Sequence, residues 1–363
     1  MANFLIAAGG TGGHVLPGLE VAKELRRRGH RSTIVGTRRG LKNRLAPAAG
    51  FQLETLRIGP LNNVSPLRRL RTAVEAPASL VAAWRLLGRQ RPAAVLSLGG
   101  YAAGPLAAAA VLRRTPLAIL EPNAYPGLAN RLTGRFARLA LLGFPEAATF
   151  FPPGRSETIG VPIRKEFFEL PPKRPEPPWT VLVTGGSQGS RTLNRAAAEA
   201  ARRWSAKPPA GGLKMLHQTG EADYNGLQSQ YARETRAPEI VLEATPFIDD
   251  MPAAFAAAHL IVCRSGASAL AELAAAGKPA VLIPFPHAAD QHQLRNAEAW
   301  AASGAAQLAL DADWSGERMA ADVEELLQSP EKLESMATAA RRRARPGAAE
   351  RASDHLEAFA RSA

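Results

Sequence analysis

The stretch Asn3-Phe-Leu-Ile-Ala-Ala-Gly-Gly-Thr-Gly-Gly13 begins with a short apolar run and leads directly into a glycine-rich turn. A helical pattern follows from Pro17 to Arg28 and ends at Gly29. Strand, glycine-rich turn and helix, in this order, form the first unit of a doubly wound α/β domain. This stretch therefore predicts that the chain opens with a Rossmann-like domain.

The same unit occurs a second time. Thr180-Val-Leu-Val-Thr184 leads into Gly185-Gly-Ser-Gln-Gly189, and another helical pattern runs from about Thr192 to Trp204. A chain of 363 residues is long enough for two such domains. Other short apolar runs bounded by Gly or Pro are typical of parallel strands buried on both faces. These runs are 30–36, 93–98, 116–121, 213–218, 240–243, 260–263 and 280–284.

A proline-rich segment separates the two copies. Leu170-Pro-Pro-Lys-Arg-Pro-Glu-Pro-Pro178 is unsuited to the interior of a helix or a sheet and is typical of a linker. We therefore expect an N-terminal domain over residues 1–161, a linker over 162–178 and a C-terminal domain over 179–340. The helical tail over 341–363 is expected to cross back to the first domain.

Positive charge is concentrated in the first half of the chain. Residues 1–161 contain 22 Lys and Arg against 7 Glu, whereas the remainder contains 23 against 25 acidic residues. This excess indicates an anionic partner such as lipid head groups, a diphosphate or nucleic acid, unless it only decorates solvated faces. No apolar run is long enough for a membrane span or a signal peptide. The single cysteine, Cys263, excludes an internal disulfide, and a cytoplasmic location is expected.

Three glycine-rich loops could hold phosphate: residues 9–13, 99–104 and 185–189. Glycine lets the backbone approach an anion closely, and the N–H groups at a helix start carry partial positive charge. A tight turn would explain one such loop, but three at strand ends favour phosphate binding. The strand Ser32–Gly36 is followed by Thr-Arg-Arg without an acidic residue, which disfavours NAD.

The second half contains a denser set of polar residues. Arg264-Ser-Gly-Ala-Ser-Ala-Leu-Ala-Glu272 follows a strand, and a carboxylate at Glu272 could accept hydrogen bonds from both hydroxyls of a ribose. A solvated helix glutamate is the other explanation. The stretch from Pro284 to Asn296 offers His, Asp and Gln side chains for sugar hydroxyls. Its spacing does not favour a metal site.

Together these motifs resemble the MurG family, the GT-B-fold N-acetylglucosaminyltransferases of peptidoglycan synthesis. The match runs in the family's order from Ala7 to about Ala297, over Gly9–His14, Gly99–Pro105, Glu121–Asn123, Gly185–Gly189, Phe247–Asp250, Arg264–Glu272 and Pro284–Asn296. The resemblance implies two Rossmann-like doubly wound parallel-sheet domains facing each other across a cleft. It also implies inverting transfer of N-acetylglucosamine from UDP-GlcNAc to a lipid-linked muramoyl-pentapeptide (lipid I to lipid II), at the cytoplasmic face of the membrane.

The resemblance implies roles for individual residues. Ser187 would contact the donor phosphate, Ile248 would present backbone groups to the uracil, and Glu272 would bind the ribose. The full set expected at donor or substrate is Thr11, Gly12, Gly13, Asn123, Arg164, Ser187, Ile248, Ala267, Ser268, Ala269, Leu270, Ala271, Glu272, His292 and Gln293. The acceptor diphosphate loop would use Gly99, Gly100, Tyr101 and Gly104.

Two positions depart from the family pattern. Glu121-Pro-Asn123 stands where the family usually has Glu-Gln-Asn, and His292-Gln293 stands where it often has two Gln. Neither departure removes a charged group, so the substrate class should be unchanged.

His14 is the candidate general base, because an unperturbed histidine has a pKa near 6.5. It could instead only donate a hydrogen bond to the acceptor diphosphate. Loop N–H groups and helix dipoles are expected to stabilise the leaving diphosphate. We therefore expect no cofactor and no fixed metal site, which leaves stimulation by divalent cations open.

A basic amphipathic stretch is the candidate membrane contact. Leu67, Leu70, Val74, Val81, Trp84 and Leu87 recur at helical spacing among arginines, and Pro77 should divide or kink the helix. Arg68, Arg69, Arg71 and Trp84 would then meet an anionic membrane surface. A surface helix packed on the first sheet is the other explanation.

Other functions remain open at this stage. A related GT-B transferase acting on diacylglycerol and a UDP-GlcNAc epimerase would share the fold. A nucleic-acid-binding protein would explain the basic half, but the chain lacks an aromatic-basic strand motif, a helix-turn-helix signature and zinc ligands. We therefore expect no nucleic-acid partner.

Overall fold

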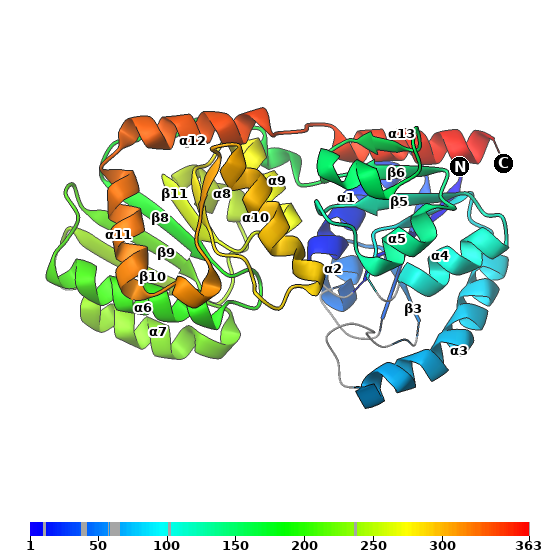
Figure 1. Ribbon diagram of the computed structural model, residues 1–363, viewed down its shortest axis with the longest axis horizontal. Helices are drawn as coiled ribbons and strands as arrows, with labels where there is room; N and C mark the ends of the chain where they lie inside the picture. Colours follow the sequence, from blue (N-terminus) through cyan, green and yellow to red (C-terminus); the bar gives the residue numbers. More distant parts are fainter. Residues whose placement is uncertain are drawn as a thin grey trace. The chain divides into compact units, whose positions relative to one another are not determined.

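The computed structural model describes residues 1–9, 12–37, 42–56, 58, 66–100, 103–235 and 238–362, except the side chains of residues 12, 42–44 and 66–74. The chain forms two compact units (Figure 1). Unit 1 comprises Met1–Arg164, His287–His292 and Arg345–Ala363. Unit 2 comprises Lys165–Pro286 and Gln293–Ala344.

Unit 1 contains a parallel sheet of seven strands in the order β3-β2-β1-β4-β5-β6-β7. An order in which the chain starts in the middle and works outward on both sides is that of a doubly wound fold. The strands are β1 (Asn3–Ala7), β2 (Arg31–Gly36), β3 (Gln52–Thr55), β4 (Ala94–Ser97), β5 (Leu117–Glu121), β6 (Leu139–Leu142) and β7 (Ser156–Thr158).

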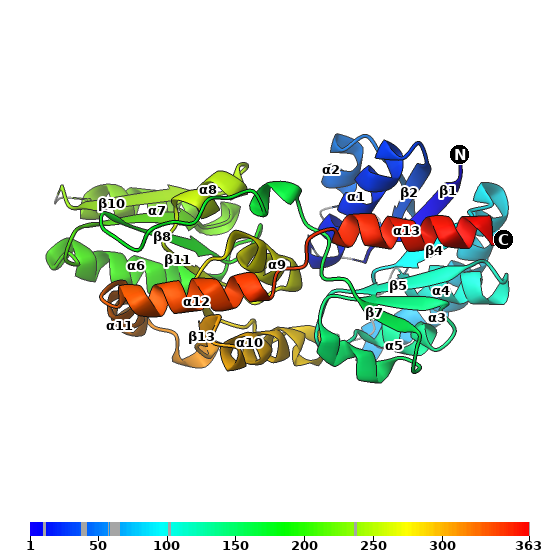
Figure 2. The same cartoon turned by 90° about the horizontal axis from the view of Figure 1, so that it is seen from above.

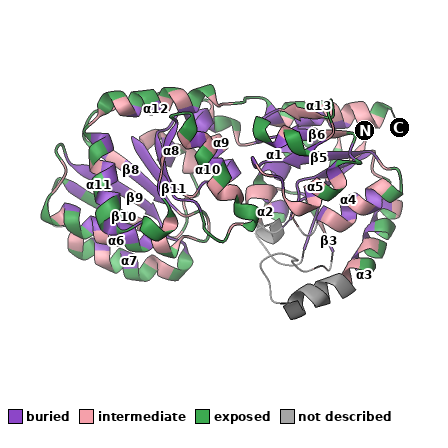
Figure 3. Ribbon diagram, viewed as in Figure 1, coloured by how far each residue is buried: buried purple, intermediate pink, exposed green. Residues whose placement is uncertain are grey.

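Helices cover both faces of this sheet, and its central strands β1, β4 and β5 are almost entirely buried (Figure 3). Phe4 and Ile6 of β1 belong to one apolar core, and Leu5 and Ala7 belong to the other. This alternation explains why β1 is a continuous apolar run. The helices are α1 (Gly12–Arg27), α2 (Lys42–Ala48), α3 (Pro66–Gln90), α4 (Ala103–Leu112), α5 (Leu128–Gly134) and α13 (Ala348–Arg361), with the 3₁₀ helix η1 (Pro145–Phe150).

The C-terminal helix α13 belongs to unit 1, where it packs on α1 and β4 (Figure 2). Leu356 is completely buried in the core that β1 shares with α1. Arg28 Nη1 lies 2.7 Å from the Asp354 carboxylate, and Arg351 Nε lies 2.6 Å from the Glu157 carboxylate. Apolar burial and ion pairs thus both hold this helix to the first sheet.

Unit 2 has a parallel sheet of six strands in the order β10-β9-β8-β11-β12-β13. The strands are β8 (Trp179–Thr184), β9 (Leu213–Gln218), β10 (Ile240–Thr245), β11 (Leu260–Cys263), β12 (Ala280–Leu282) and β13 (Ala306–Leu308). The helices are α6 (Arg191–Ala206), α7 (Glu221–Glu234), α8 (Met251–Ala257), α9 (Ala267–Ala276), α10 (His292–Ala302), α11 (Gly316–Leu327) and α12 (Pro330–Arg342). The 3₁₀ helices of unit 2 are η2 (Lys165–Phe167) and η4 (Asp311–Asp313), whereas η3 (Ala289–Gln291) falls in the short segment His287–His292 that belongs to unit 1. The prediction of two doubly wound parallel-sheet domains is therefore confirmed.

Two predicted helix boundaries were wrong. Helix α1 begins at Gly12, so Pro17 lies inside it. Helix α3 runs from Pro66 to Gln90 with Pro77 inside it, so of the two alternatives, a division or a kink at Pro77, the division is wrong. Each proline removes one backbone hydrogen bond, but tertiary packing holds both helices, since α1 packs on α13 and β2 and α3 packs on α4. Strands β3, β6, β7 and β13 were not foreseen. None of the helices in the described part of the chain is both long and apolar enough to cross a membrane.

Candidate functional site: two sheet switch points

The glycine-rich loops lie where each sheet reverses its winding. In unit 1 the reversal falls between β1 and β4, and in unit 2 it falls between β8 and β11. Loops that follow the two central strands of such a sheet diverge, and the crevice between them is where doubly wound domains bind ligands. The described residues of the first two loops, 9, 12–13, 99–100 and 103–104, lie at the first switch point, and residues 185–189 and 264–266 lie at the second.

The two loops of unit 1 pack backbone against backbone. The Gly9 N–H donates to the Gly99 carbonyl at 3.1 Å, and a Cβ at Gly9 would lie 2.6 Å from Gly100 Cα. Gly99 and Gly100 also have φ of +86° and +77°. These glycines are therefore required for the close approach of the loops, whether or not a ligand is bound. Thr11 and Tyr101 lie outside the described residues; Gly12 and Gly13 begin α1, and Gly104 lies in α4.

His14 is half-buried in the first turn of α1. Burial, and to a smaller extent the charge of His292, lowers the pKa of His14 to about 4. The ring is therefore neutral at pH 7 and has a nitrogen able to accept a proton. The expectation of a pKa near 6.5 is corrected, because burial makes this histidine a weaker base than a solvated one.

His292 lies in unit 1, in a segment from His287 to His292 whose chain neighbours on both sides belong to unit 2. His292 Nδ1–H donates to the Ala289 carbonyl at 2.7 Å, and burial lowers the pKa of His292. Asp290 lies 3.5 Å from the Arg131 guanidinium of α5, and its φ is +52°, a left-handed conformation that is uncommon for residues other than glycine. The predicted pair His292-Gln293 is thus divided between the two units.

A buried polar network lies at the carboxyl end of β5. The Glu121 carboxylate accepts from the Asn123 N–H and side-chain amide, both at 3.0 Å, from the Gly127 N–H and from Asn130 Nδ2. Ser97 Oγ in turn donates to Asn130 Oδ1 at 3.2 Å. Burial raises the pKa of Glu121 to about 7 despite these donors. Asn123 was predicted, whereas the buried carboxylate that orients it was not assigned a role.

In unit 2 the loop Gly185–Gly189 leads into α6, whose first N–H groups point toward the loop. Ser190 caps the helix, and its hydroxyl oxygen accepts from the Leu193 N–H. Ser187 is half-buried in this loop. A diphosphate beside Ser187 would therefore meet a helix start and a glycine backbone, as in other phosphate-binding turns.

Arg264 connects the loops around the second switch point. Its guanidinium donates to Ser190 Oγ at 2.7 Å and to the carbonyls of Ile283 and Pro284 at 3.0 and 3.1 Å. It also forms an ion pair with Asp311 of η4. Arg264 therefore fixes the start of α6 relative to the ends of β11 and β12, a role that sequence analysis missed.

The sequence also contains Asp311-Ala-Asp313, which was overlooked as a candidate site. Two Asp at this spacing can bind a divalent cation. The two Asp311 oxygens accept hydrogen bonds from Arg264 and from Thr192 Oγ1. The carboxylate of Asp311 is thus already used within unit 2. Within the described ranges, no group of three or more His, Cys, Asp and Glu lies close enough to hold a metal ion.

The predicted residues Ala267–Ala271 and Glu272 form the first six positions of α9. Gly266 precedes this helix without a side-chain cap, so the first N–H groups of α9 are not satisfied by a capping side chain. Ser268 Oγ is buried and has no hydrogen-bond partner within the described chain. Glu272 is half-buried, and its charge adds to burial in raising the pKa of Cys263 to about 12. Its carboxylate thus lies near the end of β11.

Two more predicted residues of unit 2 are held by hydrogen bonds. Gln293 Oε1 accepts from the Phe285 N–H at 3.0 Å, which directs its NH₂ group away from that loop as a donor. The Ile248 N–H donates to Gln218 Oε1 at 2.9 Å. A base at Ile248 would therefore meet its carbonyl oxygen, because its N–H is already used. Arg164, the last residue of the first segment of unit 1, is half-buried.

The candidate membrane residues can be followed only in part. Trp84 in α3 is 40% exposed, and the Arg113 guanidinium lies 4.6 Å from the centre of its ring. Val81 of α3 and Leu112 of α4 are also exposed. The side chains of Arg68, Arg69 and Arg71 lie outside the described part of the structure.

Two doubly wound domains with glycine-rich loops at their switch points fit a protein that binds a nucleotide or its diphosphate, and comparison with known proteins identifies the class as glycosyltransferases. The glycosyltransferase family 28 N-terminal domain matches residues 4–141, and the family 28 C-terminal domain matches residues 180–354. A relative from Solibacter usitatus (strain Ellin6076) is 48% identical, covering 99% of this chain and 97% of its own. A relative from Myxococcus xanthus (strain DK1622) is 40% identical over 98% of this chain and 92% of its own. Both are named UDP-N-acetylglucosamine--N-acetylmuramyl-(pentapeptide) pyrophosphoryl-undecaprenol N-acetylglucosamine transferase.

The crystal structure of Acinetobacter baumannii MurG superposes with a TM-score of 0.79 at 30% identity, covering 99% of this chain and 100% of that one. A Staphylococcus aureus MnaA–UDP structure, at 13% identity and a TM-score of 0.68, shares the fold alone. The chain therefore belongs to glycosyltransferase family 28 and, within it, to the MurG family of N-acetylglucosamine transferases.

Proposed function

We propose that the chain transfers N-acetylglucosamine from UDP-N-acetylglucosamine to undecaprenyl-diphospho-muramoylpentapeptide, which converts lipid I to lipid II. The observation that carries this proposal is the arrangement of groups at the second switch point, between β8 and β11. There the Gly185–Gly189 loop and the uncapped start of α9 with Glu272 lie at the ends of neighbouring strands β8 and β11. Phosphate-binding N–H groups beside a carboxylate suited to a ribose match the parts of a nucleoside diphosphate.

The donor would be held mainly by unit 2. Ser187 and the start of α6 would bind the diphosphate, Glu272 the ribose hydroxyls and the Ile248 carbonyl the uracil N–H. Gln293, together with His292, would bind the hydroxyls of the sugar. Arg164 would lie near the donor. This assignment extends the hydrogen bonds described above, which leave the Gln293 amide N–H groups and the Ile248 carbonyl available to a ligand.

The reaction would be a single displacement with inversion. The acceptor hydroxyl oxygen attacks the anomeric carbon, the bond from that carbon to the diphosphate oxygen breaks, and UDP leaves with the electron pair. His14 would take the proton of the hydroxyl, since burial keeps its ring neutral at pH 7. Gly99, Gly100, Asn123 and the start of α1 would bind the acceptor diphosphate.

We propose that transfer uses no cofactor and no fixed metal site. The helix starts of α6 and α9 supply positive potential where the diphosphate leaves. Turnover should therefore persist after dialysis against EDTA. Loss of all turnover that added Mg²⁺ or Mn²⁺ restores would refute this part of the proposal.

We also propose that unit 1 contacts the cytoplasmic face of an anionic membrane, where a lipid-linked acceptor must remain. Trp84 would insert together with Val81 of α3 and Leu112 of α4, which are also exposed, and arginines would bind lipid head groups. Trp84→Ala should weaken binding to anionic vesicles at every salt concentration. Replacing Arg68, Arg69 and Arg71 together by Gln should weaken it mainly at low salt. Equal vesicle binding by parent and variants would place the contact elsewhere.

The decisive experiment incubates the purified protein with labelled UDP-N-acetylglucosamine and a lipid-linked muramoyl-pentapeptide. A labelled disaccharide lipid and stoichiometric UDP support the proposal. Label in a diacylglycerol, or release of N-acetylmannosamine without an acceptor, would identify a related transferase or an epimerase instead. Salt-dependent binding of RNA without any donor binding would indicate a different function altogether.

A further inference from the structure

A buried histidine of unit 2 has no part in the proposed reaction. His217, at the end of β9, is completely buried, and burial lowers its pKa to about 3, so the ring carries one proton. Its Nδ1 lies 2.7 Å from the Tyr231 hydroxyl, and its Nε2 lies 3.1 Å from Asn194 Oδ1. The ring thus connects α7, which carries Tyr231, to α6, which carries Asn194.

The direction of these hydrogen bonds follows from Asn194. Its Nδ2 lies 2.8 Å from the Thr219 carbonyl oxygen and 2.7 Å from Asp223 Oδ2, and both of these atoms only accept. The NH₂ group must therefore face them, so Asn194 Oδ1 faces the histidine. His217 Nε2–H donates to that oxygen, and His217 Nδ1 accepts from the Tyr231 hydroxyl. One tautomer of His217 satisfies every atom in the series.

The series ends at the glycine-rich loop. A Cβ at Gly189 would collide with the Thr219 carbonyl, and a Cβ at Gly220 would collide with the Gln188 carbonyl. Residues Gln188 and Gly189 therefore lie directly on the turn formed by Thr219 and Gly220. The Thr219 carbonyl oxygen, which accepts the hydrogen bond from the Asn194 amide, is thus also the atom on which Gly189, at the end of the loop, packs.

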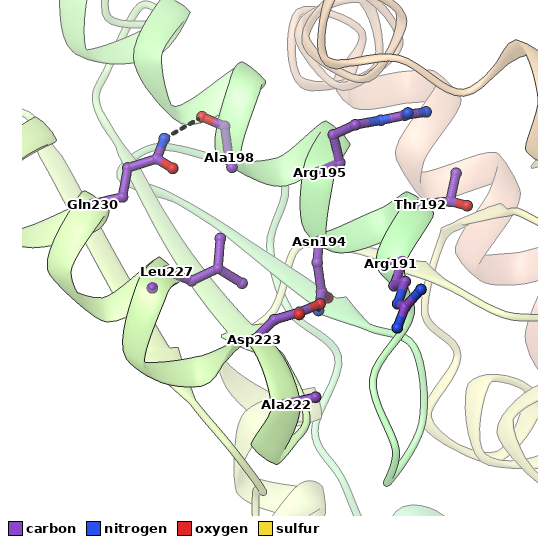
Figure 4. A pocket seen from close by; sticks show the side chains of 10 residues that line it. Arg191, Thr192, Asn194, Arg195, Ala198, Ala222, Asp223, Leu227 and Gln230 are labelled. Atoms are coloured by element: carbon purple, nitrogen blue, oxygen red, sulfur yellow. Dashed lines mark hydrogen bonds between the residues drawn. The ribbon is translucent and has the colours of Figure 1, made fainter.

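The network also reaches solvent. Asn194 and Asp223 point toward one another at a pocket of about 670 Å³ between α6 and α7 (Figure 4). Asp223 belongs to the first turn of α7 and helps to fix the start of that helix relative to α6. Tyr231, His217, Asn194 and Asp223 thus tie both helix starts to the turn that supports the loop.

We propose that Tyr231, His217 and Asn194 are positioning residues that hold the Gly185–Gly189 loop in the conformation that binds the donor diphosphate. The inference rests on the proposed function for the ligand, but the contacts that carry it are separate from those assigned to substrate. The network acts on the loop through the Thr219 carbonyl.

Two variants test the network at different points. Tyr231→Phe keeps the buried ring but removes the donor to His217, and the Kd for UDP should rise about five-fold, the effect of one lost hydrogen bond. Asn194→Asp keeps the shape but removes both donors to Thr219 and Asp223, and the Kd should rise by roughly ten-fold or more. Tyr224→Phe, in the same helix and outside the network, is the matched control and should bind UDP as the parent does.

The readouts are UDP titration calorimetry, the KM for donor and acceptor, and hydrogen exchange of the amides of residues 185–190. The increase in UDP Kd, in donor KM and in the exchange rate of the loop amides should be largest for Asn194→Asp, smaller for Tyr231→Phe and absent for Tyr224→Phe. The acceptor KM should be unchanged in all three variants. A purely structural role would lower thermal stability without changing these three.

If the parent binds UDP and both network variants bind it equally tightly with unchanged loop exchange, the positioning inference is wrong and the proposed function stands. If the parent itself neither binds UDP nor transfers the sugar, the proposed function fails and this inference fails with it.

Discussion

Arg264 offers the sharpest test of how unit 2 is held together. Its side chain is 11% exposed and that of its partner Asp311 is 17% exposed, so most of this ion pair is removed from water. Arg264→Ala would leave the Asp311 carboxylate with the Thr192 hydroxyl and would remove three further hydrogen bonds, to Ser190, Ile283 and Pro284. Removing one partner of a buried pair costs about 3–5 kcal/mol.

We therefore expect the free energy of unfolding of unit 2 to fall by about 3–5 kcal/mol in Arg264→Ala. Arg264→Lys keeps the charge but cannot reach all four acceptors, and should lie between Arg264→Ala and the parent. Lys332→Ala is the control, because the Lys332–Glu325 pair is 41% and 61% exposed and should contribute less than about 1 kcal/mol.

Urea denaturation followed by tryptophan fluorescence suits this measurement. Four of the five tryptophans, Trp179, Trp204, Trp300 and Trp314, belong to unit 2, and a Trp84→Phe background makes the signal specific to it. A double-mutant cycle with Asp311→Asn separates the ion pair from the other hydrogen bonds. If Arg264→Ala destabilises unit 2 no more than Lys332→Ala, the assignment of Arg264 as the connecting residue is wrong.

Three further predictions concern single side chains. Glu272→Gln should raise the donor KM several-fold, since it loses charge-assisted hydrogen bonds of about 1–3 kcal/mol; unchanged kinetics would remove Glu272 from the site. His14→Ala should lower kcat by roughly 10²–10⁴. In the parent the acid limb of kcat should lie near pH 4, because His14 stays neutral until the pH falls to its lowered pKa, and the variant should lack it. A kcat within a few-fold of the parent would leave His14 a positioning residue at most. Glu121→Gln should lower the free energy of unfolding of unit 1 by about 2–4 kcal/mol, because the new NH₂ group faces two of the four N–H donors. Glu54→Gln, on the exposed pair with Arg89, should change it by less than about 1 kcal/mol, and equal effects would contradict this reasoning.

The sequence carried enough information for the architecture because its main signals are local. An apolar run followed at once by a glycine-rich turn and a helical pattern identifies a strand, its loop and its helix without reference to the rest of the chain. The strands that were missed include β3, β7 and β13, which have three or four residues and lie at or near sheet edges. Such strands form because a neighbour offers unpaired backbone groups, and their own residues carry little pattern.

The residues that support the loops were set by tertiary structure alone. Arg264 meets Asp311 across 47 residues, His217 meets Asn194 across 23, and Arg28 meets Asp354 across 326. No local pattern marks such pairs, and the same holds for the assignment of His292 to unit 1 and for the pKa of His14. The unit to which His292 belongs depends on its tertiary contacts, and the pKa of His14 depends on its burial and its charged neighbour. Such contacts and burial form only when distant segments pack together. Local glycine and strand patterns were sufficient to predict two doubly wound domains and the positions of their glycine-rich loops. Which side chains contact those loops depends on the packing of segments that are far apart in the sequence.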